Sequence, residues 1–450
     1  MSRIRIIITI IVVVLTTLLT GCTGKEPNEI AYVVALGIDS TDDDNYKITI
    51  QYANTTQISG GASESGGKAG SEIVDNVTIE APNIYAGVGL ANNIVSKSFS
   101  MSHAKLIVFS KEIAEKGVKD MIETLVRSEE IRPDVFIAVA NTTANDYLTS
   151  VNPEMEVNPA QYYQLIYQKN QLVGIPDGQL REFFTGLYTD NYDSILPVAG
   201  VIEGAGGNSQ NDDKGQSKDG QNEGSEGSSE SLGSFESKSS DDKDENEKEK
   251  DAEKNTSKYE YDIKNYVGGE TAIEKKNKAE AIGAAVFEKD KMVGELGEVE
   301  TEICKILKGD YTYSYLTYYN NDTPDIPITV KTTQQKKPKY KIDTDKKTVD
   351  IELYIESDLY SLPADYNVEN KIEDFERDVA NYTSSACTEF INNFTKKYNS
   401  DILKLNEKVK YKFLTNNQYN WFKKNVGWSE YKFSVCTNFK VRRTGLIVRE

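Results

Sequence analysis

Residues 105–140 read KLIVFSKEIAEKGVKDMIETLVRSEEIRPDVFIAVA, and they alternate between the patterns of strand and helix. The apolar runs KLIVF and DVFIAVA are short, continuous and rich in β-branched and aromatic residues, as buried strands are. Between them, Ser110 is a good helix N-cap, and Met121 and Leu125 recur at helical spacing. Strand, helix and strand in this order are typical of an α/β domain.

The same alternation continues on both sides of this stretch. On its N-terminal side, residues 29–54 have the pattern of a β-hairpin, and residues 72–97 that of a strand followed by a helix. On its C-terminal side, residues 158–188 are mostly helical in pattern, and residues 194–203 return to a strand. We therefore expect one α/β domain over residues 22–203.

The composition changes abruptly after this domain. Residues 204–257 hold 15 acidic and 7 basic residues among glycine, serine and asparagine, with almost nothing apolar. Such a stretch cannot bury enough apolar surface to offset its ordering entropy, so we expect residues 204–258 to be a disordered acidic linker. The composition favours a spacer and leaves the role of an interaction tail open.

A second domain is expected over residues 259–450. It begins with a hairpin pattern at 281–296 and a short helix at 298–307, and several tyrosine-rich strands follow. Apolar residues then recur every three or four positions along a long helix at about 366–398, and an alternating strand closes the chain. The predicted fold is mixed α/β or α+β: several small, mostly antiparallel sheets with flanking helices, and one long helix in the C-terminal half.

The first residues have the pattern of a bacterial lipoprotein signal. Two arginines precede an apolar stretch at 6–19, which is long enough for a signal peptide and short for a membrane span. The sequence LTGC at 19–22 resembles the lipobox, in which the cysteine receives a diacylglycerol and becomes the first residue after cleavage. We therefore expect residues 1–21 to be a signal peptide, cleavage between Gly21 and Cys22, and lipid attachment at Cys22.

The sequence carries few of the groups that catalysis needs. His103 is the single histidine, which excludes a His-rich metal site, and no Ser or Cys motif designates it as a base. A structural hydrogen bond suits it better than a functional role. No P-loop, dinucleotide-binding, nucleophile-elbow or zinc-protease motif occurs. We expect no enzyme, no metal and no cofactor, and the net charge of −19 argues against nucleic acid as a partner.

The remaining cysteines need no special role. Cys304, Cys387 and Cys436 are widely spaced and lack the C-x-x-C pattern of metal or redox sites. We interpret them as small buried side chains, although one disulfide among the three stays open.

Four stretches, taken in order, resemble the Ger(x)C family of spore germination lipoproteins. They are the lipobox with the strand that ends in GID at 37–39, the strand, helix and turn of residues 102–140, the hairpin GAAVFEKDKMVGEL at 283–296, and YNSDILKLN at 398–406 with NWFKKN and FKVRRTG after it. Asn406 is a departure, because glycine is common there in the family.

This resemblance implies a non-enzymatic C subunit of a nutrient germinant receptor. The family's lipid, palmitate included, would hold it on the outer face of the spore inner membrane, with integral membrane A and B subunits as partners. Whether this subunit contacts the nutrient stays open. The alternative is a solute-binding lipoprotein of a transporter, which needs two similar lobes around a cleft; the two halves of this chain differ in pattern.

Overall fold

The computed structural model describes most of the chain outside its first 28 residues and the expected linker. The described residues are 3–7, 9, 29–43, 45–53, 74–153, 156, 158–168, 174–189, 191–202, 265–271, 277–319, 327–361, 371–398 and 400–444. The predicted cleavage site at Gly21 and Cys22 and the predicted linker 204–258 lie outside them.

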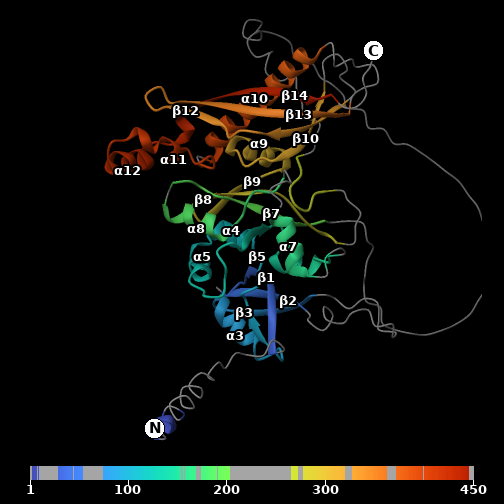
Figure 1. Ribbon diagram of the computed structural model, residues 1–450, viewed down its shortest axis with the longest axis vertical. Helices are drawn as coiled ribbons and strands as arrows, with labels where there is room; N and C mark the ends of the chain where they lie inside the picture. Colours follow the sequence, from blue (N-terminus) through green and yellow to red (C-terminus); the bar gives the residue numbers. More distant parts are fainter. Residues whose placement is uncertain are drawn as a thin grey trace, which may run out of the picture. The chain divides into compact units, whose positions relative to one another are not determined.

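The main sheet has nine strands in the described part of the chain (Figure 1). Their order is β3-β2-β1-β5-β6-β7-β8-β9, and the short β4 pairs with the start of β1. The strands are β1 (Ile30–Ser40), β2 (Tyr46–Ala53), β3 (Val74–Ala81), β4 (Ser98–Ser100), β5 (Leu106–Ser110), β6 (Phe136–Ala140), β7 (Ile195–Val201), β8 (Ala279–Glu288) and β9 (Lys291–Leu296).

The centre of this sheet is parallel and covered on both faces. β1, β5, β6 and β7 run in the same direction, and every residue of β5 and β6 is buried. Continuous apolar runs are what such doubly covered strands require. One face packs against α3 (Ile84–Ala91), α4 (Lys111–Lys116), α5 (Lys119–Val126) and α8 (Leu180–Thr189). The other face packs against α6 (Ala144–Ser150) and α7 (Pro159–Gln168).

Local signals place the helices that follow β5. The Ser110 hydroxyl accepts a hydrogen bond from the backbone N–H of Ile113, at 3.4 Å, and so caps α4 as the sequence predicts. Gly117 then adopts a φ of 124°, a conformation that side chains disfavour, and it separates α4 from α5. The helical pattern between the two buried strands therefore forms two short helices.

The second half of the chain extends the main sheet. β8 pairs antiparallel with β7, so that Ile195 lies opposite Val286 and Leu196 opposite Ala285. β8 then turns back into β9, the hairpin that the sequence predicts. One sheet thus includes strands from both sides of the predicted linker.

A second sheet has five strands in the described part of the chain. Its order is β10-β11-β13-β12, with β14 on the other side of β13 in parallel. The strands are β10 (Tyr313–Tyr319), β11 (Pro327–Gln334), β12 (Lys339–Asp343), β13 (Thr348–Ser361) and β14 (Lys432–Arg443). The helices α9 (Glu298–Lys308) and α10 (Ile372–Tyr398) pack against this sheet (Figure 1).

The long helix α10 covers the open edge of β14. A row of polar side chains one turn apart, Ser384, Thr388 and Asn392, accepts hydrogen bonds from β14 backbone N–H groups at 2.9–3.1 Å. An edge strand with free donors invites pairing with another chain, and this polar row removes several of those donors.

The predicted mixed fold is confirmed, including the long helix of the C-terminal half, which spans Ile372–Tyr398. Within that class, the main sheet joins strands that the sequence assigned to separate small sheets. The sequence did not predict α11 (Leu405–Val409) and α12 (Asn416–Asn425), which follow α10. No helix among the described residues is long and apolar enough to cross a membrane.

The packing of α3 can be tested with two glycines on the same helix. A Cβ atom at Gly87 would lie 2.6 Å from Cδ1 of the fully buried Ile48, whereas a Cβ atom at Gly89 meets nothing within 4 Å. Gly87→Ala should lower the free energy of unfolding by about 1–3 kcal/mol. Gly89→Ala should raise it by up to about 1 kcal/mol. Urea denaturation of both variants checks this, and equal effects would contradict the packing.

Candidate functional site

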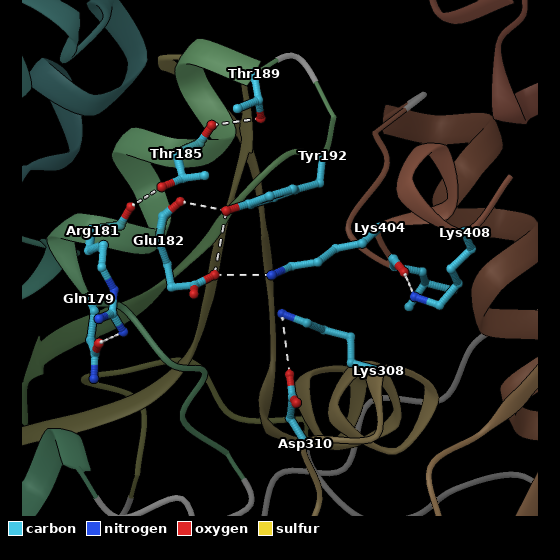
Figure 2. A network of polar contacts seen from close by, with 11 residues as sticks. Gln179, Arg181, Glu182, Thr185, Thr189, Tyr192, Lys308, Asp310, Lys404 and Lys408 are labelled. Carbon is cyan, nitrogen blue, oxygen red and sulfur yellow. Dashed lines mark hydrogen bonds and ion pairs between the residues drawn. The ribbon is translucent and has the colours of Figure 1, made fainter. Parts of the chain in front are cut away.

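A pocket of about 360 Å³ lies between segments from both halves of the chain. It is lined by the start of α8, the chain that leads into β7, the end of α9 and Lys404 (Figure 2). Four carboxylates and two lysines face it: Asp177, Glu182, Asp193, Asp310, Lys308 and Lys404. No histidine or cysteine lines it. It is therefore a charged junction whose ionisable groups are carboxylates, lysines and tyrosines.

Lys404 is the residue that joins the two sides of this pocket. Its Nζ lies 3.0 Å from Oε2 of Glu182 and 4.2 Å from the centre of the Tyr192 ring (Figure 2). Its backbone has a left-handed φ of 56°. A cation placed over an aromatic ring and beside a carboxylate interacts with both.

The electrostatics around Glu182 favour its charged form. Burial opposes ionisation, but the hydrogen bond and charge of Lys404, helped by Lys308 and Arg181, outweigh it and lower the pKa of Glu182. Burial and the nearby Glu182 charge raise the pKa of Tyr192, whose hydroxyl donates to the Glu182 backbone carbonyl at 2.9 Å. Glu182 is thus charged and paired with Lys404, and the Tyr192 phenol beside it is neutral.

Both lysines of the pocket are paired with carboxylates. Besides Lys404 with Glu182, Lys308 Nζ lies 3.8 Å from Asp310 on the same turn. Burial raises the pKa of Asp177, although the charge of Lys308 works in the opposite direction. The pocket therefore presents no unpaired cation to a ligand, and its carboxylates outnumber its lysines.

Two aspartates, Asp193 and Asp401, hold the segment that carries Lys404 through hydrogen bonds, and we call them the clasp. The backbone N–H of Asp193 donates to the Asp401 carbonyl at 3.2 Å, and the N–H of Asp401 donates to the Asp193 carboxylate at 2.9 Å. The Asp401 carboxylate also accepts from the N–H groups of Leu405 and Asn406, at 2.7 and 2.8 Å, at the start of α11. Burial raises the pKa of Asp401 to about 7, against the effect of these donors.

Asn406 and α12 extend the junction. The Asn406 side chain accepts from the indole N–H of Trp428 at 3.2 Å, and its carbonyl accepts from the Tyr419 hydroxyl at 3.1 Å. Lys423 on α12 donates to the Thr189 carbonyl at 3.2 Å, at the end of α8. Asn406, noted as a departure from the family pattern, therefore has a structural use that a glycine could not supply.

The other residues singled out in the sequence are His103 and the predicted cleavage site at Gly21 and Cys22. His103 is exposed in a turn before β5, where its Nδ1 lies 3.0 Å from the Ser102 hydroxyl oxygen and its ring packs edge-on against Tyr32. This agrees with a structural hydrogen bond. Cys22 and Gly21 lie outside the described residues.

The three downstream cysteines are free thiols. Cys304 and Cys387 are buried as predicted, and burial raises the pKa of each thiol, to about 11 and about 12. The prediction is wrong for Cys436, which is exposed because it points to the outer side of the alternating strand β14. Among the described residues, no group of three or more His, Cys, Asp or Glu side chains is placed to hold a metal ion.

The fold and the junction define an α+β protein in which two sequence segments share one sheet and are joined by hydrogen bonds between Asp193 and Asp401 and by the Lys404–Glu182 ion pair. The chain belongs to the Ger(x)C family of spore germination proteins. The family description "Spore germination protein N-terminal domain" matches residues 24–201, and "Spore germination B3/ GerAC like, C-terminal" matches residues 282–445.

Individual relatives are distant. The spore germination protein KC of Bacillus subtilis is 26% identical over 36% of this chain and 43% of its own length, and the putative spore germination protein YfkR of the same organism is 28% identical over 32% and 37%. The chain thus spans about two fifths of the curated relatives it matches. The crystal structure of the GerBC protein aligns over 90% of this chain and 96% of its own, with a TM-score of 0.48 and 15% identity.

The buried carboxyl of Asp401 makes the stability of the clasp depend on pH. Its folded-state pKa of about 7 lies above the ordinary value of roughly 4, so its contribution to the free energy of unfolding is full below about pH 4 and is lost as the pH rises to 7. The Asp401→Asn variant cannot ionise, so it avoids this loss of stability, which is on the order of 2–4 kcal/mol. It also removes one acceptor of the α11 cap. The variant should therefore be destabilised at pH 5 and much less so at pH 8.

Denaturant unfolding of both proteins at the two pH values checks this prediction. Asp134→Asn, which removes an exposed carboxyl, is the matched control and should have little effect at either pH. A cost of Asp401→Asn that is the same at pH 5 and pH 8 would contradict the raised pKa.

Proposed function

We propose that this chain is the lipid-anchored, non-enzymatic C-type subunit of a nutrient germinant receptor. The observation that carries the proposal is the match of both family segments, over residues 24–201 and 282–445, directly behind a lipobox.

The anchor is proposed at Cys22. Cleavage between Gly21 and Cys22 would leave the cysteine as the first residue, carrying at least two acyl chains, which is the number that stable anchoring takes. Only six residues lie between Cys22 and Glu29, so Glu29 would stay within roughly 25 Å of the bilayer surface. The anchor would place the chain on the outer face of the spore inner membrane.

The proposed partners are the integral membrane A and B subunits of the receptor. In this assignment, the body of the chain scaffolds the complex or transmits its response, and the nutrient pocket belongs to another subunit. The ion pairs of Lys404 with Glu182 and of Lys308 with Asp310 support this division, because both lysines of the pocket are already paired.

A transporter's solute-binding lipoprotein is the weaker assignment. Such a protein needs two lobes that close on a cleft. Here the pairing of β7 with β8 makes strands of both halves part of one sheet, and the pocket between them is crossed by the Lys404–Glu182 ion pair. Rigid sharing of a sheet argues against hinge closure.

A gene replacement in a sporulating host tests the proposal. Deletion of the gene should impair germination with nutrients and leave vegetative growth unchanged, and the intact gene should restore germination. The Cys22→Ala variant should appear in the soluble fraction after a high-salt wash and fail to restore it, because the anchor is lost. Spores of the deletion strain that germinate normally with every nutrient, in a host stripped of related receptors, would contradict the function; a Cys22→Ala chain that stays in the membrane would contradict the anchor.

A further inference from the structure

The turn between α11 and α12 and the outer face of α12 expose an unusual set of side chains. We call Lys410, Tyr411, Leu414, Trp421 and Lys424 the basic–aromatic patch. The exposed fractions are 78% for Tyr411, 94% for Leu414 and 64% for Trp421. These three side chains come from one stretch of eleven residues, and exposed apolar groups that form a contiguous surface mark interaction sites.

The patch is exposed because the opposite face of α12 holds the helix in place. Tyr419 and Phe422 are buried and pack against Phe413, with ring centres 5.9 and 5.0 Å apart, and Phe422 also packs against Trp428. The Thr415 hydroxyl caps the first turn. A fixed inner face leaves Trp421 and Lys424, three residues apart, on the outer face.

The charge of this region is opposite to that of the whole protein. Residues 405–425 contain five lysines and one glutamate, in a chain whose net charge is −19. Several of these lysines are used internally: Lys412 donates to the Ile342 carbonyl and Lys423 to that of Thr189. Lys410 and Lys424 are exposed, and neither forms an ion pair among the described residues; Lys410 Nζ lies 5.7 Å from the centre of the Tyr419 ring. A local cationic surface of this kind attracts an anionic partner.

α12 contacts the chain at the end of the sheet where the parallel strands begin. It contacts Thr189 and Asn191, directly before β7, through Lys423 and Tyr419. Since β1, β5, β6 and β7 are parallel, β1 and β7 begin at this same end, with β5 and β6 between them. β1 begins eight residues after Cys22.

We propose that the basic–aromatic patch docks on the anionic headgroup layer of the membrane. Tryptophan and tyrosine prefer the membrane–water interface, leucine can enter the acyl boundary, and lysines attract anionic lipids. The proposal rests on the lipid anchor at Cys22 to bring the patch to the surface. With the anchor and the patch both engaged, the body would have one orientation on the membrane rather than swing on its tether.

The chain carries its own probe for this contact. Its two tryptophans are Trp421, in the patch, and Trp428, which is 4% exposed. The lipidated full-length protein is reconstituted into vesicles of brominated phosphatidylcholine, with or without brominated phosphatidylglycerol. Docking predicts a blue shift and quenching of emission with phosphatidylglycerol and much less without it. Trp421→Phe should abolish this response, because Trp428 is shielded.

A pair of charge variants provides the matched control. Lys410→Gln with Lys424→Gln should reduce the quenching, whereas Lys336→Gln with Lys337→Gln, the same charge change on the exposed turn between β11 and β12, should leave it unchanged. Equal loss in both double variants would overturn the patch in favour of a general charge effect.

Flotation of the same vesicles separates this proposal from the anchor. A chain that floats with both vesicle types but shows no quenching of Trp421 is anchored without docking, which overturns the patch and points to a protein partner there. A chain that floats only with anionic vesicles supports the patch and contradicts the anchor. A chain that floats with neither overturns both.

Discussion

The structure depends on the antiparallel pairing of β7 with β8. β7 is the last strand of the first family segment and β8 opens the second, and their pairing continues the same sheet from one to the other. The core behind this sheet includes Phe183 of α8 and Phe287 of β8, whose ring centres lie 5.1 Å apart. The clasp of Asp193 and Asp401 and the Lys404–Glu182 ion pair lie at the start of β7, so the pairing also positions the polar junction.

Local signals predict the elements, and their long-range arrangement needs the structure. The continuous apolar runs of β5 and β6, the Ser110 cap and the periodic apolar stripe of α10 are all predictable because each is a local pattern of residue types. The partnership of β7 and β8 is not readable, since 77 residues separate their ends and no spacing encodes a pairing over that length. α12 is missed because only Tyr419 and Phe422 mark its buried face. Asp401 is of a residue type that caps helices, but its contact with Asp193 at the start of β7 is long-range, and the sequence does not show it.

The features that bear on function gather where the parallel strands begin. The proposed tether from Cys22 leads into β1, and the hydrogen bonds between Asp193 and Asp401 lie at the start of β7. Trp421 and Lys424 of the basic–aromatic patch lie on α12, which Lys423 joins to Thr189. Asn406 connects Asp401 with α12. Its backbone N–H donates to the Asp401 carboxylate, its side chain accepts from the Trp428 indole N–H, and its backbone carbonyl accepts from the Tyr419 hydroxyl. Lys423 and Tyr419 of α12 contact the segment before β7, so this helix is fixed to the main sheet.

Separate expression of the two halves, residues 22–203 and 259–450, tests this account most directly. Because β7 would lose its partner β8 and expose a hydrophobic strand edge, neither half alone should show cooperative unfolding, and the two expressed together should co-purify and unfold in one transition. Two halves that each unfold cooperatively alone, and that do not associate when mixed, would contradict the claim that one shared sheet unites the chain.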